Sequence, residues 1–269
     1  MVRSGGNRQD VFSFSRVTSF EQCARRYRYR YLDGVQEAFQ GIEGFMGNRV
    51  HDAVEWLFRE REHQRVHDAA RLVGWYTEAF DRELSAASGR TKVVKQGRSV
   101  EDYRRDGAAM LADFHRMRFG SDDLETVGLE RHFELQLPGG QRFQGFIDRL
   151  ARDASGTLHI IDYKTGSRPA TRFEGKDAQQ LEAYAVAMFA EDSAVGAGES
   201  IELRLEYLRN ASVVRRTIRR DEALEVGRRL AARIDYAATA TVFPPSPGVL
   251  CGWCGFNDVC EAAPQRKGR

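Results

Sequence analysis

The sequence predicts an α/β protein in which a mixed sheet is flanked by helices and a long helical segment is inserted. Apolar residues recur at helical spacing through residues 45–118, whereas apolar and polar residues alternate as in strands from residue 127 onward. Helical spacing returns at residues 176–191, between two groups of strands, as in sheets covered by helices. With 269 residues, of which 42% are hydrophobic, the chain can bury a core of this size in one domain.

The first predicted helix runs from Thr18 to about Leu32, because Thr18 and Glu21 form a capping-box pattern. Arginines and tyrosines alternate within it over residues 25–31. Such interleaving is typical of nucleic-acid surfaces, but the tyrosines can equally bury the helix and leave a solvated arginine face. The pattern leaves both interpretations open.

Further helices and strands follow in order. Residues 45–62 carry an apolar stripe with His51 beside it, whereas the helical segments at 67–87 and 98–118 show periodicity without candidate chemistry. The last two are therefore predicted to be packing elements or an insertion. After the strands around residues 127–164 and the helix at 176–191, the pattern predicts strands near 201–208 and 213–218 and a helix from an Asp221 cap to about Ala238.

Two neighbouring strands, one with Asp148 and one with Asp162, carry the most informative residues. A three-residue loop between them, ending in a left-handed Gly156, would place Asp148 opposite Asp162. Lys164 lies two residues beyond Asp162 and projects from the same face of its strand. This register brings two carboxylates and one ammonium to one surface.

Two carboxylates this close repel each other unless a divalent cation lies between them, and oxygen ligands suit Mg²⁺ or Mn²⁺. The alternative is that Asp148 pairs with Arg149 or Lys164 at a hairpin end, as many surface charges do. Burying charged groups beside the apolar Ile160 and Ile161 costs free energy, which a functional role for these charges would explain. The sequence therefore favours a metal site with a lysine beside it.

The four cysteines form a second candidate site. Cys251, Cys254 and Cys260 are spaced C-x2-C-x5-C, and Cys23 stands alone near the other end of the sequence. In a chain without secretory features, this clustering favours metal ligation over disulfides. Four thiolates suit zinc or an iron–sulfur cluster. The spacing alone does not distinguish these two cofactors from each other, or from cysteines that bind no metal.

Charge and hydropathy exclude several classes of protein. The net charge of +2 is no strong polyanion signal, so any nucleic-acid affinity must come from local patches. No apolar run approaches membrane-spanning length, the first residues lack a signal-peptide core, and no P-loop motif occurs. The expected setting is cytoplasmic, without a membrane partner.

The order helix, three antiparallel strands, helix, strand resembles the core of the PD-(D/E)XK, or restriction-endonuclease-like, nucleases. Four short motifs resemble the RecB-like branch, in order: a histidine on the first core helix at His51, Gly-x-x-Asp-Arg at 145–149, Asp-Tyr-Lys-Thr-Gly at 162–166, and Gln180-x-x-x-Tyr184. The resemblance spans about Phe12 to Cys260.

The cysteine arrangement resembles the iron–sulfur members of that branch, which include AddB-type helicase–nucleases and CRISPR-adaptation nucleases. In those proteins one N-terminal and three C-terminal cysteines hold a [4Fe–4S] cluster; here Ala24 replaces the proline that often follows the first cysteine. The resemblance implies one nuclease domain over 1–269, with a cysteine cluster joining its N- and C-terminal segments. Its parts are an iron–sulfur region at 11–32 and 239–262, a nuclease core at 44–58 and 125–208, and a helical insertion at 59–124.

The resemblance also implies a metal-dependent DNA nuclease, expected to be an exonuclease in repair or recombination. The implied Mg²⁺ or Mn²⁺ ligands are Asp148, Asp162, His51 and the Tyr163 carbonyl, with Lys164 orienting water or stabilising the transition state and Gln180 and Tyr184 positioning water, Lys164 or substrate. Glu130 and Glu134 are weaker candidates for a place near the ion. The [4Fe–4S] cluster, with zinc as the alternative, would be held by Cys23, Cys251, Cys254 and Cys260.

The expected partners are DNA with a single-stranded portion and a helicase or repair protein. Two other functions compete with this one. The first is a non-catalytic nucleic-acid-binding subunit that keeps the fold, and the second is a zinc-stabilised interaction protein in which the carboxylates are incidental.

Overall fold

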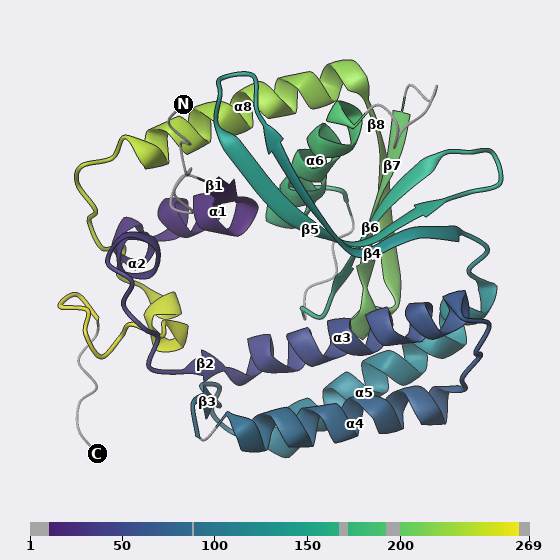
Figure 1. The fold of residues 1–269 in the computed structure, drawn as a ribbon. Helices are drawn as coiled ribbons and strands as arrows, with labels where there is room; N and C mark the ends of the chain where they lie inside the picture. Colours follow the sequence, from purple (N-terminus) through teal and green to yellow (C-terminus); the bar gives the residue numbers. More distant parts are fainter. Residues whose placement is uncertain (1–10, 88, 167–171, 192–199, 264–269) are drawn as a thin grey trace, which may run out of the picture.

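The computed structural model describes residues 11–87, 89–166, 172–191 and 200–263. A mixed sheet in the described part of the chain lies between two layers of helices (Figure 1). Its strands are β1 (Val11–Ser13), β4 (Glu125–Gln136), β5 (Arg142–Arg152), β6 (Leu158–Lys164), β7 (Ser200–Tyr207) and β8 (Ser212–Arg219).

Strand β5 organises the sheet. It pairs antiparallel with β4 along one edge, while its other edge pairs parallel with β1 at its start and antiparallel with β6 at its end. The sheet continues through the parallel pair β6–β7 and the antiparallel pair β7–β8. Strands pair with both edges of β6 and helices cover both of its faces, so its side chains are buried except at its last residue, Lys164.

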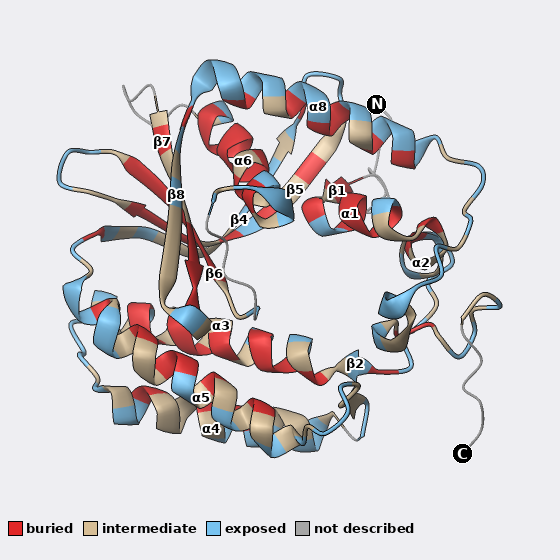
Figure 2. Ribbon diagram, turned by 180° about the vertical axis from the view of Figure 1, so that it is seen from behind, coloured by how far each residue is buried: buried red, intermediate tan, exposed pale blue. Residues whose placement is uncertain are grey.

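Helices cover both faces and create two cores. One core joins α1 (Phe14–Gln22), α6 (Gly175–Ala190) and α8 (Arg220–Ala238) to the sheet. The other joins α3 (Ile42–Glu62), α4 (Ala69–Ala86) and α5 (Val100–Met117) to the opposite face. The buried residues of α3 and α6 line the sides that face the sheet (Figure 2). The predicted α/β fold, with a mixed sheet flanked by helices, is confirmed.

The N-terminal helix differs from its prediction. It begins at Phe14, because the Ser13 side chain accepts a hydrogen bond from the Arg16 amide at 3.2 Å and caps the helix. Thr18 lies inside the helix, where its hydroxyl donates to the Ser15 carbonyl. The helix also stops at Cys23, whose backbone is extended, before the short helix α2 (Ala24–Tyr27) and a π-helical turn (Arg28–Leu32).

The last helix also has a different cap. Arg219 occupies the N-cap position, where its amide donates to the Glu222 carboxylate at 3.0 Å. Asp221, the predicted cap, lies in the first turn of the helix. A carboxylate there still interacts favourably with the positive end of the helix dipole.

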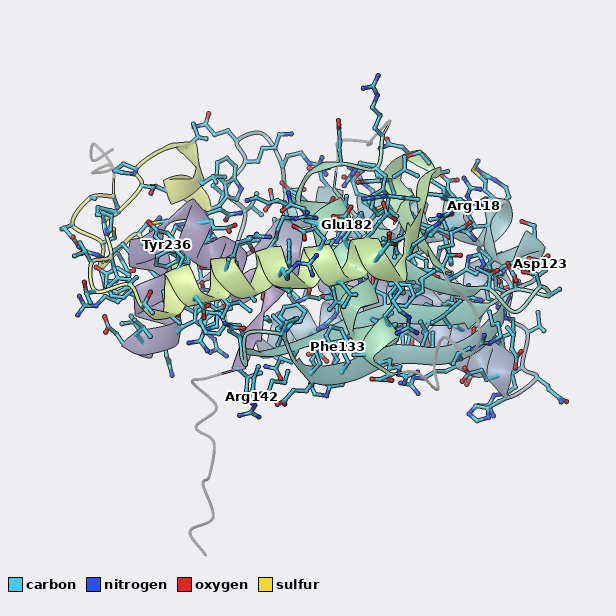
Figure 3. All side chains as sticks on the ribbon, turned by 90° about the horizontal axis from the view of Figure 1, so that it is seen from above. Arg118, Asp123, Phe133, Arg142, Glu182 and Tyr236 are labelled. Atoms are coloured by element: carbon cyan, nitrogen blue, oxygen red, sulfur yellow. The ribbon has the colours of Figure 1, made fainter. Side chains whose placement is uncertain are left out.

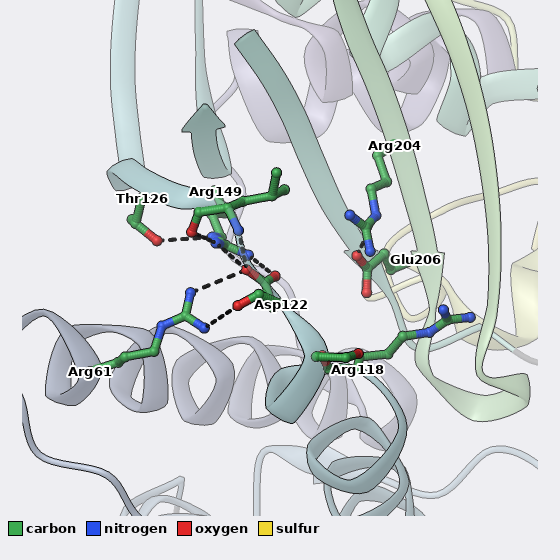
Figure 4. Close-up of polar contacts among 9 residues, drawn as sticks. Arg61, Arg118, Asp122, Thr126, Arg149, Arg204 and Glu206 are labelled. Carbon is green, nitrogen blue, oxygen red and sulfur yellow. Dashed lines mark hydrogen bonds and ion pairs between the residues drawn. The ribbon is translucent and has the colours of Figure 1, made fainter. Parts of the chain in front are cut away.

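A buried charge cluster fastens the helical layer to β5 (Figure 4). Arg149 is 0% exposed, and its Nη2 donates to Asp122 Oδ1 at 2.9 Å and to the Leu124 carbonyl at 3.1 Å. Arg61 of α3 lies 3.3 Å from the same carboxylate, and the Arg149 guanidinium lies over the Phe58 ring at 3.9 Å. Because Arg149 follows Asp148, this cluster fixes the strand segment that carries the candidate metal ligands.

Candidate metal centre

The β5–β6 hairpin has the predicted register. The Asp153 amide bonds to the Thr157 carbonyl at 3.1 Å, and Gly156 has a φ of +88°, so the three-residue loop is confirmed. Arg149 pairs with Ile161, which places Asp148 opposite Asp162. Beyond this point the two strands separate, since their backbone pairing starts at Arg149. The separation leaves room for side chains between the strands.

Asp148 fills this space. Its Oδ2 accepts a hydrogen bond from the Tyr163 amide at 2.8 Å, in the place of a strand-to-strand bond. The same oxygen lies 3.2 Å from Nδ1 of His51, which reaches it from α3. Gly47, one turn earlier on α3, allows this approach, because a β-carbon there would lie 3.0 Å from the Thr165 hydroxyl.

Glu130 joins these two residues. His51, Glu130 and Asp148 each offer a ligand atom, and these atoms lie within 4.8 Å of one another. Glu130 has a left-handed backbone with a φ of +44°, which is uncommon for a residue with a side chain and is found disproportionately at functional sites. It lies on β4 between the pairs Leu129–Arg149 and Arg131–Ile147, opposite Asp148.

Glu130 and Glu134 both occupy polar positions of an alternating strand, so the residue pattern does not distinguish them. The structure separates them: Glu134 is exposed and pairs with Arg142 at 2.5 Å. The signal that distinguishes Glu130 is its positive φ, and the residue type does not reveal it. Asp162 lies outside the group of three, and its place among the metal ligands stays a prediction.

The acidic residues of the centre stabilise positive charge on His51. Burial disfavours charge on His51, but the Asp148 and Asp162 carboxylates raise its pKa to about 9. Burial and the Asp148 charge raise the pKa of Glu130 to about 7. Burial opposes ionisation of Asp148 as well, yet His51 and the Tyr163 amide hold its pKa below the usual value. A divalent ion would replace the His51 proton as partner of these carboxylates, and the oxygen-rich donor set fits Mg²⁺ or Mn²⁺.

Asp162 and Lys164 begin a polar chain beside this centre. Lys164 Nζ lies 2.7 Å from Asp162 Oδ2 and donates to Gln180 Oε1 at 3.1 Å, and Gln180 Nε2 donates to the Tyr184 hydroxyl at 2.7 Å. Burial disfavours charge on Lys164, but Asp162 raises the pKa of the ammonium above its usual value. Asp162 is 3% exposed, and burial raises its pKa to about 6 against the effect of Lys164. The structure thus brings the four predicted residues into contact.

Gly145 explains how α6 comes close enough to complete this chain. A β-carbon at this position would lie 2.7 Å from the Phe133 ring and 2.8 Å from the Tyr184 ring. Those rings pack edge to face with centroids 5.2 Å apart. The glycine three residues before Asp148 therefore sets the distance between the sheet and α6.

The four cysteines line one pocket, together with Arg26, Tyr29 and Phe256. All four are free thiols, and the Ser246 amide lies 3.5 Å from Cys23 Sγ. Backbone contacts also join the two ends, since the Arg25 amide donates to the Pro244 carbonyl at 3.2 Å. Among the described residues, no three thiols come within 4.8 Å of one another.

The neighbouring arginine and tyrosine run packs against the protein. Tyr27 is 2% exposed and stacks on Phe243. Arg28 pairs with Asp33 at 3.1 Å, and Arg25 and Arg30 form ion pairs with Glu261 and Glu37. These contacts favour a packed Tyr27 and an ion-paired arginine face over a free nucleic-acid surface.

The chain is similar to a known family of proteins. The model of the PD-(D/E)XK nuclease superfamily matches residues 11–261. A search of curated proteins found no match. Among solved structures, the crystal structure of SSO0001 is 16% identical with a TM-score of 0.38, and the similarity covers 97% of this chain and 91% of that chain. Within the described residues, no helix combines the length and apolar character needed to cross a membrane.

Proposed function

Because the chain belongs to the PD-(D/E)XK nuclease superfamily, we propose that it is a Mg²⁺- or Mn²⁺-dependent deoxyribonuclease. One observation carries the proposal: His51, Glu130 and Asp148 gather possible ligand atoms within 4.8 Å, next to the ion pair of Asp162 and Lys164. A binding module has no evident need for this concentration of buried charge.

We assign roles from these contacts. Asp148 and His51 would hold the ion together with Asp162 and the Tyr163 carbonyl, and Glu130 is an added candidate ligand. The ion would lower the pKa of a bound water and offset charge on the phosphate. Lys164 is a compact ammonium held at the edge of this centre, where it can orient the water or stabilise the charged phosphate.

Gln180 and Tyr184 act through Lys164 or through the substrate. The Gln180 carbonyl oxygen accepts from Lys164 and its amide nitrogen donates to Tyr184, so one orientation of the side chain satisfies both contacts. This arrangement restricts the ammonium to the side of the sheet that carries the carboxylates. An exonuclease activity, a repair or recombination setting, a helicase partner and a cytoplasmic location rest on the sequence resemblance and are part of the proposal.

For the cysteines we propose a [4Fe–4S] cluster with a structural role. The pocket lined by Cys23, Cys251, Cys254 and Cys260 supports ligation of one cofactor by both chain ends. Four thiolates suit either a tetrahedral zinc or a [4Fe–4S] cluster. We prefer the cluster because the division into one N-terminal and three C-terminal cysteines resembles that of the iron–sulfur nucleases.

The test compares Asp162→Ala and Lys164→Ala with the unchanged protein on end-labelled single- and double-stranded DNA and on closed circles. We expect both changes to abolish Mg²⁺- or Mn²⁺-dependent cleavage without loss of folding. Glu134→Gln is the matched control, because this exposed carboxylate lies outside the centre and pairs with Arg142. Cleavage retained by both purified variants would refute the site.

The same substrates separate the competing functions. Shortening of labelled ends with intact circles indicates an exonuclease, whereas linearised circles indicate an endonuclease. DNA binding without cleavage in either metal would favour the non-catalytic subunit. A colourless protein that contains zinc, together with inert carboxylates, would favour the interaction protein.

A further inference from the structure

A cleft of about 580 Å³ opens beside the polar chain of Lys164, Gln180 and Tyr184. Gln180 and Tyr184 form part of its α6 wall, so the cleft borders the polar chain that leads to Lys164. Gln144 and Phe146 contribute a wall from β5. The volume lies in the range of about 300–1,000 Å³ that is usual for small-ligand sites.

The strand pairing explains why a cleft exists at this place. Strand β4 occupies one edge of β5 along most of its length, so β1 and β6 share the other edge. The pairing with β1 ends at Gln144, and the pairing with β6 begins at Arg149. Within the described chain, residues 145–148 therefore have no strand partner on that edge. A ligand there approaches the sheet beside Asp148.

An exposed aromatic pair lies along this part of β5. Phe146 is 54% exposed, and His132 lies directly opposite on β4 with the ring centroids 4.8 Å apart. His132 Nε2 also lies 3.3 Å from Gln144 Oε1, so the imidazole contacts both the Phe146 ring and the Gln144 side chain. Exposed aromatic rings of this kind stack with nucleobases. Phe146 is two residues from Asp148, about 7 Å along a strand, which is the scale of one nucleotide.

The charge at the cleft suits a phosphate. Lys176 lines the cleft, is exposed, and makes no ion pair with any residue that the structure describes. The nearby Asp177 carboxylate is compensated, because it lies 3.7 Å from Lys164 Nζ and accepts from the Tyr207 hydroxyl. The cleft thus offers a free ammonium for the phosphate and an exposed ring for the base of a single-stranded nucleotide.

We propose that this cleft binds an unpaired nucleotide next to the phosphate at the metal centre, with its base stacked on Phe146. His132 supports the ring, and Lys176 contacts the adjoining backbone phosphate. A base inside a duplex has both faces covered by its neighbours, so it cannot stack on Phe146 without leaving the helix. The cleft therefore selects DNA with an unpaired nucleotide beside the cut. This inference rests on the proposed nuclease function.

The test measures binding without metal. Fluorescence anisotropy of labelled single-stranded oligonucleotides in EDTA compares the unchanged protein with Phe146→Ala. We expect roughly a 5- to 140-fold loss of affinity, the amount typical for removing one base-stacking ring. Phe146→Trp should keep most of the affinity, whereas Phe146→Leu, which fills the space without a ring, should resemble Phe146→Ala. Tyr236→Ala is the control, because Tyr236 lies on α8 (Figure 3), is 73% exposed, and is not one of the residues that line the cleft.

A series of oligonucleotides, each lacking one base, identifies the stacked position. At that position Phe146→Ala should cost no further affinity, because the base that it contacts is already absent. An equal loss on every oligonucleotide would show that the ring is structural and would overturn the inference, as would a loss below twofold. If the unchanged protein cleaves DNA while the series shows no coupling, the inference fails and the nuclease proposal stands. If the unchanged protein neither binds nor cleaves DNA, both fail.

Discussion

Replacing Asp122 by alanine should destabilise the protein strongly, although Asp122 lies far from the metal centre in the sequence. The change removes the carboxylate partner of Arg149, which is 0% exposed, and leaves a guanidinium without a counter-charge in the interior. Breaking one side of a buried ion pair typically costs about 3–5 kcal/mol. The Leu124 carbonyl, the Thr126 hydroxyl and the Phe58 ring still contact Arg149, so we expect the lower end, about 3 kcal/mol.

Urea unfolding at neutral pH, followed by circular dichroism, measures this loss, and the melting temperature should fall by about 6–12 °C. Asp123→Ala is the matched control, because its exposed side chain forms no ion pair or hydrogen bond with the described residues. Its stability should change by no more than about 0.5 kcal/mol.

A second variant tests the cause of the loss. Adding Arg149→Met to Asp122→Ala removes the unpaired charge and should recover part of the lost stability, because an apolar side chain tolerates this interior better than a lone guanidinium. The reasoning is refuted if Asp122→Ala costs less than about 1 kcal/mol. It is also refuted if the double variant is as unstable as the sum of the two single changes, since that would show no coupling between the charges.

Three further outcomes are expected. Gly145→Ala should cost about 1–3 kcal/mol in urea unfolding, because the new methyl group meets the Phe133 and Tyr184 rings; unchanged stability would contradict the close packing. The Mn²⁺ affinity measured by calorimetry should rise from about pH 6 to pH 9 and then level off. The reason is that neighbouring carboxylates raise the pKa of His51 to about 9, and the ion must displace the His51 proton. His51→Gln should flatten this rise. Cys254→Ala should lower solubility and melting temperature and remove visible absorbance, and a soluble variant of unchanged melting temperature would argue against a structural cluster.

The features that depend on short-range geometry could be predicted from the sequence. The side-chain period of two and the three-residue loop with Gly156 determine that Asp148 faces Asp162 and that Lys164 follows on the same strand face. Helical periodicity located α3, α4, α5 and α6 within a few residues, because an amphipathic helix must bury one stripe whatever it packs against. These features follow from neighbours in the chain.

The residues that complete each site could be identified only from the tertiary packing. Glu130 and Glu134 have the same chemistry and strand phase, yet only Glu130 joins His51 and Asp148, because its backbone turns left-handed opposite the separating strands. The Arg149–Asp122 pair and the cleft at Phe146 likewise join segments distant in sequence. Such contacts depend on how the sheet, α3 and α6 pack together, and a local pattern of residue types does not contain that information.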